Sequence, residues 1–159
     1  MRRLVTPLIV LLALSACSTI NCPLNNVVGT YYKLGGEVKR LGGELTVTTA
    51  TNNGNDTVVL NRAAAVDSFA LPISYTNKED VFTLQLVKTD GTKITDRIRV
   101  EKENYEHFES TDCSPAFFHR ITGVNHTENM IESIEINNAN VTYDSSKAHF
   151  IIRFKSVAQ

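Results

Sequence analysis

Three cysteines and four histidines are the residues of this chain whose side chains could do chemistry. A cysteine can accept a lipid, form a disulfide, or act as a nucleophile when a nearby histidine lowers its pKa. None of the histidines stands at a close ligand spacing or beside a cysteine motif; they are His107, His119, His126 and His149. We therefore expect no metal site and no cofactor, and we expect His119 to lie in or near the core.

Cys17 stands in the sequence context of a lipid acceptor. It follows Leu14-Ser15-Ala16, and an aliphatic residue with two small residues before a cysteine is the order of the bacterial lipobox. Arg2 and Arg3 give a positive start, and the apolar run over residues 4–13 is shorter than the roughly 20 residues of a membrane span. An ordinary secretory signal is the alternative, but no Ala-x-Ala site lies just downstream. The sequence predicts a signal peptide over residues 1–16 and lipidation, palmitate included, at Cys17.

The residues after Cys17 indicate where the anchored protein would reside. Inner-membrane retention requires an acidic residue beside the lipidated cysteine, and the segment 18–21 carries none. The segment also lacks the acidic cluster that is typical of surface export. Because several acyl chains on one cysteine form a stable anchor, we expect the membrane itself to be a partner. The predicted location is the outer membrane, facing the periplasm, with the cell surface as the alternative.

Cys22 and Cys113 remain as a pairable set once Cys17 carries lipid. In an oxidising compartment a bridge between them would close a loop of about 90 residues, for which chain entropy gives roughly 4 to 5 kcal/mol of stabilisation. Two free thiols are one alternative. A nucleophilic Cys113 assisted by His119 is another, although its surroundings match no cysteine enzyme.

Two further patterns concern carboxylates and a hydroxyl. The chain lacks Gly-x-Ser-x-Gly, His-Glu-x-x-His and Ser-x-x-Lys, so no catalytic residue is assigned and a noncatalytic protein is expected. Paired surface carboxylates could still serve a glycan-binding module or a hydrolase, which is the alternative function. Asp56-Thr57-Val58 resembles an O-glycosylation acceptor of gut-type bacteria, which makes Thr57 a candidate modification site.

Short runs of alternating apolar residues, separated by turn residues, must position these groups. They predict one all-β domain over residues 26–159, after a lipidated tether over 17–25. We expect a two-layer antiparallel β-sandwich, Ig-like in general architecture, with a small β-barrel as the alternative. Asn53-Gly54 and Asp90-Gly91 predict hairpins, and the glycine pairs within 33–44 predict a hairpin tip or loop. Asp96 interrupts an apolar strand face, which indicates a bulge or a hydrogen-bonded edge.

The charge balance excludes one class of partner. Lys plus Arg number 16 against 17 for Asp plus Glu, so no basic field supports nucleic-acid binding. Removing residues 1–16 removes two arginines and leaves the mature chain mildly acidic, at a net charge of −3.

The chain resembles a family of uncharacterised lipoproteins from Bacteroides-like bacteria. The segments that carry the resemblance are residues 17–26, 71–75, 107–113 and 127–136. Counterparts of both Cys22 and Cys113 in that family imply that the two are paired, and the family carries no catalytic residue over to this chain. The resemblance also implies partnership with an outer-membrane β-barrel or another envelope protein. We therefore expect a lipid-anchored, noncatalytic binding or assembly protein of the cell envelope.

Overall fold

The computed structural model describes residue 22 and residues 27–50 and 54–159; the predicted signal peptide and Cys17 lie outside these residues. The described chain is all-β, as the alternating pattern predicts, and a 3-10 turn at Ser156–Ala158 follows the last strand. Within the described ranges no helix is long and apolar enough to span a bilayer. The described residues form ten strands: β1 (Gly29–Gly35), β2 (Gly43–Ala50), β3 (Asp56–Ala64), β4 (Ser68–Pro72), β5 (Glu79–Lys88), β6 (Lys93–His107), β7 (Ala116–His126), β8 (Ile131–Ile136), β9 (Asn140–Val141) and β10 (Phe150–Phe154).

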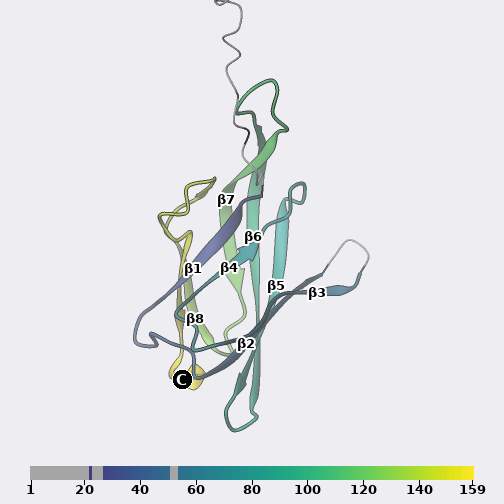
Figure 1. The fold of residues 1–159 in the computed structure, drawn as a ribbon. Coiled ribbons are helices and arrows are strands. Elements are labelled where there is room, and N and C mark those ends of the chain that lie inside the picture. Colours follow the sequence, from purple (N-terminus) through teal and green to yellow (C-terminus); the bar gives the residue numbers. More distant parts are fainter. Residues whose placement is uncertain (1–21, 23–26, 51–53) are drawn as a thin grey trace, which may run out of the picture.

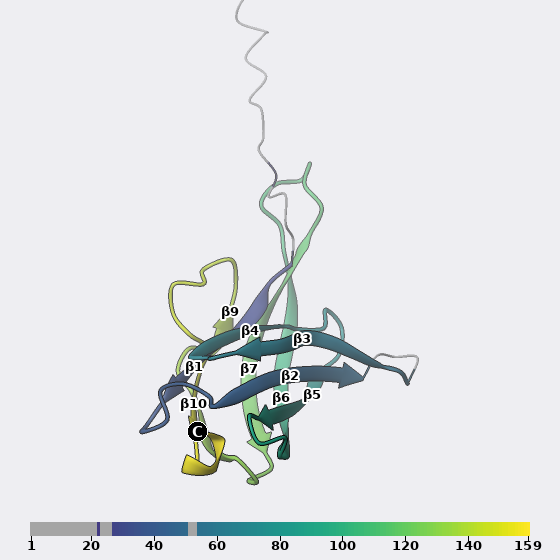
Figure 2. The same cartoon turned by 60° about the horizontal axis from the view of Figure 1, so that its bottom comes forward.

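The strands form two sheets in a sandwich-like arrangement, so the predicted fold class is confirmed over the alternative of a small barrel (Figure 1, Figure 2). One sheet has the order β4-β1-β10-β8 and the other the order β3-β2-β5-β6-β7-β9. The described pairs are antiparallel except β1 with β10, which run parallel. The sheets are therefore predominantly antiparallel, as predicted, with one parallel pair. The first and last strands need no short connection, and that freedom permits parallel pairing.

Both predicted hairpins are present. β2 pairs with β3 around Gly54, and β5 pairs with β6 around Gly91; both glycines have a positive φ, which a side chain rarely tolerates. The segment between β1 and β2 behaves differently, because these two strands belong to different sheets. It is a loop that crosses from one sheet to the other, and the alternative of a hairpin tip is wrong.

The core lies between the sheets and follows the alternation of the strands. On β5 the inward residues Phe82, Leu84 and Leu86 are buried, and Tyr32 of β1 stacks between two further aromatic rings. Asp96 is also buried, and its carboxylate accepts hydrogen bonds from the backbone N–H groups at 129–131. The charge that interrupts this apolar face therefore holds the start of β8 in place.

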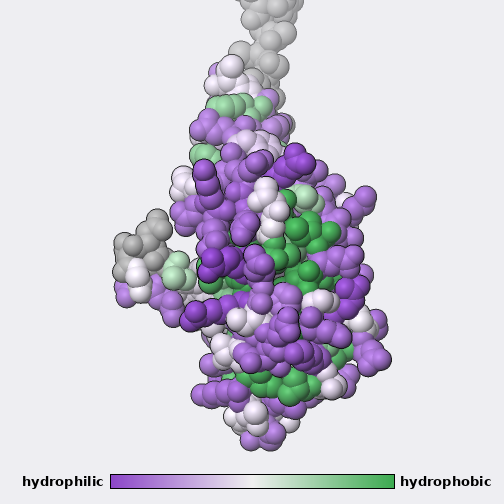
Figure 3. Space-filling model, turned by 180° about the vertical axis from the view of Figure 1, so that it is seen from behind, coloured by the Kyte–Doolittle hydropathy of each residue, from purple (hydrophilic) through white to green (hydrophobic). Residues whose placement is uncertain are grey.

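The outer surface is mainly hydrophilic. Figure 3 shows a polar face on which apolar side chains gather in separate areas. Arg97, Arg99 and Glu101 of β6 point outward, as their position in the alternating pattern predicts.

β6 and β7 form the longest hairpin and extend past the body of the sandwich. β6 has 15 residues and β7 has 11, and the loop 108–115 joins them. Their joined ends project from one end of the molecule, opposite the C-terminal 3-10 turn (Figure 1). This projecting hairpin carries Cys113 in its loop.

Candidate functional site

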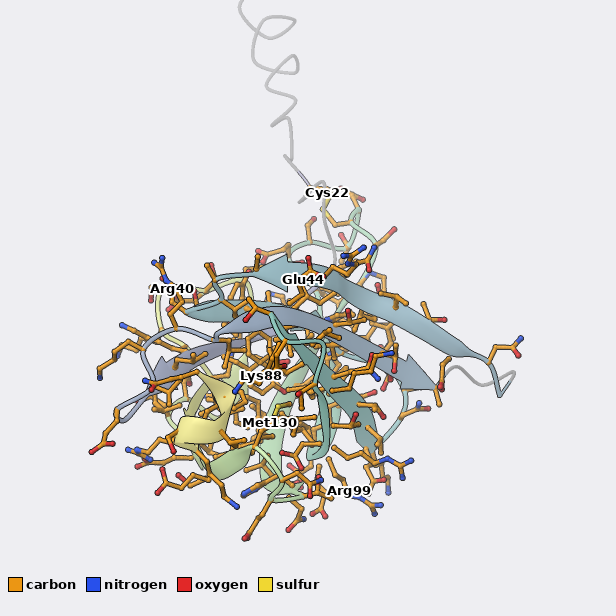
Figure 4. All side chains as sticks on the ribbon, turned by 90° about the horizontal axis from the view of Figure 1, so that it is seen from below. Cys22, Arg40, Glu44, Lys88, Arg99 and Met130 are labelled. Atoms are coloured by element: carbon orange, nitrogen blue, oxygen red, sulfur yellow. A yellow bond between two sulfur atoms is a disulfide. The ribbon has the colours of Figure 1, made fainter. Side chains whose placement is uncertain are left out.

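A disulfide joins the projecting loop to the chain that precedes the domain. Cys22 and Cys113 are bonded, with their Cα atoms 5.5 Å apart, and Figure 4 shows Cys22 at the periphery of the molecule. The predicted bridge is thus confirmed. The two alternatives, free thiols and a nucleophilic Cys113, are wrong because neither sulfur is free in this structure.

Hydrogen bonds within the loop hold its shape around the disulfide. The backbone N–H of Cys113 donates to the carbonyl of Ser110 at 3.2 Å, and the N–H of Asp112 donates to the Ser110 hydroxyl at 3.3 Å. Nε2 of His107 lies 3.0 Å from a carboxylate oxygen of Glu109. The loop is therefore a compact, acidic turn clamped by Cys113 to the chain at Cys22.

Aromatic side chains cover the hairpin just below the loop. His107 stacks on Phe118 at 4.3 Å between ring centroids, and Tyr143 meets Phe118 edge-on at 4.9 Å. Tyr105 meets the same ring edge-on at 6.1 Å. Tyr105 and Tyr143 remain 43% and 37% exposed. We call these four residues the aromatic cluster; it presents a partly exposed apolar surface of the kind that anchors protein interfaces.

A buried ionic cluster lies at the base of the hairpin. The ammonium of Lys102 is fully buried, 3.4 Å from a carboxylate oxygen of Asp80. It also donates to the carbonyl of Ser74 at 2.8 Å, to the side-chain oxygen of Asn104 at 2.9 Å and to the carbonyl of Asn77. Lys102 therefore fastens the loop between β4 and β5 to β6, and its three protons are occupied.

His119 completes this cluster on the neighbouring strand. Its Nδ1 lies 2.7 Å from the Asn104 oxygen, which already accepts from Lys102, so Nδ1 carries the proton. Its Nε2 is buried, and the described residues offer it no hydrogen-bond partner. Burial, and secondarily the charge of Lys102, lower the pKa of His119 to about 4. His119 is thus a neutral core residue, as the sequence predicts.

Burial also lowers the pKa of Lys102, although the nearby carboxylate of Asp80 opposes the shift. A lysine with a lowered pKa can act as a base or nucleophile when a substrate reaches it. Here the surrounding carbonyls enclose the amine and its side chain is fully buried. The arrangement supports a structural role for the cluster.

The alternating pattern contains the signal for this cluster, although sequence reasoning passed over it. Lys102 has the same parity on β6 as the buried Ile98 and Val100, and Asp80 has the parity of the apolar run on β5. Two opposite charges at apolar positions of sequence-adjacent strands predict a buried ion pair. Asp96 interrupts an apolar strand face in the same way, and the sequence pattern shows it plainly. Asp80 and Lys102 stand at the ends of the apolar faces of their strands, where a charge is less conspicuous.

The other candidate residues lie apart from the hairpin. Thr57 is exposed near the start of β3, an edge strand, and its neighbours Asp56 and Val58 are exposed too. The O-glycosylation prediction for Thr57 therefore concerns an accessible site. In the part of the chain that the structure describes, no group of three or more His, Cys, Asp or Glu residues is placed to hold a metal ion.

An open depression of about 850 Å³ lies beside the base of the hairpin. Tyr75 and Phe117 form a stacked pair at 5.6 Å within it, and Glu101 and Glu103 lie along its wall. It combines aromatic faces with carboxylates, which are the groups that bind carbohydrate hydroxyls and ring faces.

Comparison with known proteins places this architecture in a family. Residues 44–154 match the Family of unknown function (DUF6452). Comparisons with curated proteins and with solved structures give no match. The matched range covers well over half of the chain and runs from β2 to the end of β10, including the buried ionic cluster and the projecting hairpin. The chain therefore belongs to this family of unknown function.

Proposed function

We propose that the protein is a lipid-anchored, noncatalytic binding or assembly protein of the bacterial cell envelope. Cys17 would carry the lipid, and the mature domain would face the periplasm from the outer membrane. The single observation that supports this most is the Cys22–Cys113 disulfide. It fastens the domain by its projecting hairpin to a point only five residues after the predicted lipid acceptor.

The aromatic cluster supports a binding role. Tyr105, on a hairpin held by a disulfide, and Tyr143, on the loop that packs against it, both expose ring surface. Aromatic residues on a rigid support are typical interface anchors. The buried ionic groups below are enclosed by loop carbonyls, so they support the scaffold. A membrane-embedded partner, such as an outer-membrane β-barrel, would lie within reach of a surface carried so close to the anchor.

Photocrosslinking in cells tests this role. A photoreactive amino acid at Tyr143 should capture one specific envelope protein, identified by mass spectrometry. The matched control carries the same group at Val58, which is exposed on the edge strand β3. Recovery of the same abundant bystanders from both positions would count against a binding role for the aromatic cluster.

A second candidate function is glycan binding at the depression beside the hairpin, favoured by the stacked Tyr75–Phe117 pair next to Glu101 and Glu103. If it operates, the purified protein sediments with insoluble envelope polysaccharide, and Tyr75→Ala reduces that binding. Tyr31→Ala, at another exposed tyrosine, is the control. Absence of sedimentation by the unmodified protein would contradict this candidate.

A further inference from the structure

We infer that the loop 108–115 at the end of the β6–β7 hairpin contacts the lipid surface itself, with Phe108 entering the interface. This inference rests on the proposed lipidation of Cys17. It assigns the end of the hairpin to lipid and leaves the aromatic cluster on its flank for a protein partner.

The tether between the predicted lipid site and the disulfide is short. Cys22 is the fifth residue after Cys17, and a fully extended chain spans at most about 3.6 Å per residue. Cys22 therefore lies within about 18 Å of the lipidated cysteine. Since the disulfide places the Cα atoms of Cys22 and Cys113 5.5 Å apart, the Cα atom of Cys113 lies within about 24 Å of the lipidated cysteine.

The loop exposes a large aromatic side chain. Phe108 is 58% exposed, the most exposed large apolar residue described in the structure. It is the first residue after β6, and the joined ends of β6 and β7 project from one end of the molecule (Figure 1). Aromatic rings favour the boundary between headgroups and acyl chains. The anchor supplies the affinity, and the short tether makes contact by Phe108 an intramolecular event at high effective concentration.

The charge of the loop identifies the kind of lipid surface. Glu109 and Asp112 in the loop and Glu106 near the end of β6 are exposed, and no Lys or Arg occurs between Lys102 and Arg120. The segment from Cys17 to Tyr32 carries no charged side chain either. An acidic loop is repelled by an anionic surface within a Debye length, so the surface that it fits is zwitterionic.

The chain contains no tryptophan, so one substitution creates a unique fluorescent reporter. Phe108→Trp is placed in the mature, lipidated protein, which is reconstituted into phosphatidylcholine vesicles with brominated acyl chains. Val157→Trp is the matched control, because Val157 is 42% exposed in the 3-10 turn at the opposite end of the molecule. Flotation of the vesicles reports anchoring independently of fluorescence.

We expect F108W to float with the vesicles, to show a blue-shifted emission and to lose about half of its fluorescence to the brominated lipid, while V157W is unquenched. Replacing part of the phosphatidylcholine with anionic phosphatidylglycerol should weaken the quenching of F108W. Reduction of the disulfide should weaken it too. Vesicle-bound F108W that is no more quenched than V157W would overturn the inference and leave the proposed anchoring intact. Quenching only in native membranes that contain protein partners would also overturn it. Failure of both variants to float would overturn the proposed anchoring and the inference together.

Discussion

Individual buried charged residues hold the segments that precede two strands of this protein, β5 and β8. Asp96 and Lys102 lie on the inward face of the same strand, β6, and each binds backbone groups from another segment. Asp96 accepts N–H groups that precede and begin β8, and Lys102 donates to carbonyls of the loop before β5. Burial of a charged group has a desolvation free energy cost, and several hydrogen bonds to each of these groups offset it.

Replacement of Asp96 by Asn should destabilise the fold by about 3 kcal/mol, because an amide NH2 would face backbone N–H donors that the carboxylate now satisfies. Although burial alone would raise the pKa of Asp96, hydrogen bonds from Thr127 and residues 129–131 hold it below its ordinary value. Urea unfolding at neutral pH measures the loss. Asp67→Asn, at an exposed aspartate, is the control and should change the free energy of unfolding by less than about 0.5 kcal/mol. Equal stability of D96N and D67N would contradict this account.

Lys102→Met should cost roughly 3 to 5 kcal/mol, because it leaves the carboxylate of Asp80 buried without its partner. The double variant D80N/K102M should be more stable than K102M, since it removes the second charge as well. Urea unfolding of the two single variants and the double variant measures this coupling. Additive losses in the double variant would show that the two charges do not interact.

His119 makes the stability depend on pH. Its pKa is about 4 in the folded protein against an ordinary value of 6.5. Between pH 4 and pH 6.5 the unfolded chain therefore binds a proton at this imidazole that the folded chain does not bind. Stability should be fully present above pH 6.5 and should fall as the pH drops toward 4, by about 3 kcal/mol from this group. An NMR titration of the imidazole measures the midpoint directly. A midpoint near 6.5 would refute the buried neutral state.

At the scale of elements, the β6–β7 hairpin connects the interior to the end of the molecule. Its base carries Lys102 and His119, its flank carries the aromatic cluster, and its loop carries Cys113. Because β6 is also the partner of β5, the projecting loop is continuous with the most central pairing of the larger sheet. A load on the tether at Cys22 is therefore transmitted to the core through two long strands.

Removal of the disulfide in C22S/C113S should lower the free energy of unfolding by about 4 to 5 kcal/mol, because the bridge closes a segment whose ends are 91 residues apart. The sandwich itself should persist, since its core lies between the sheets. Urea unfolding compares the variant with the oxidised protein. A reductant should lower the stability of the unmodified protein to that of the variant and leave the variant unchanged. If the reductant changed the stability of neither protein, the prediction would be contradicted.

The sequence allows the elements to be predicted where the signal is local. Alternation identifies the strands, and Gly54 and Gly91 identify hairpins because their backbones need a positive φ. The parallel pairing of β1 with β10 could not be predicted, since no local signal records which distant strands become neighbours. The aromatic cluster was missed for a similar reason: Tyr143 reaches Phe118 from a separate loop, so the cluster exists only in the fold.

At the scale of the whole molecule, the proposed anchor and the described domain form one account. The domain is a two-sheet body with one projecting hairpin, and the disulfide attaches that hairpin to the chain just after the predicted lipid site (Figure 1). Such an attachment restricts how the domain can turn relative to a membrane. The body and the aromatic cluster would then face a constant direction, which suits a protein that binds or assembles another envelope component.

The most direct test of this account is the fate of the protein when Cys17 is replaced by Ala. Cells that express the unmodified chain or C17A are labelled with a palmitate analogue, and membranes are separated from soluble protein. We predict that the unmodified chain is labelled and found in the outer-membrane fraction, whereas C17A is unlabelled and soluble. Label and membrane association that persist in C17A would contradict the lipid anchor on which the proposed function depends.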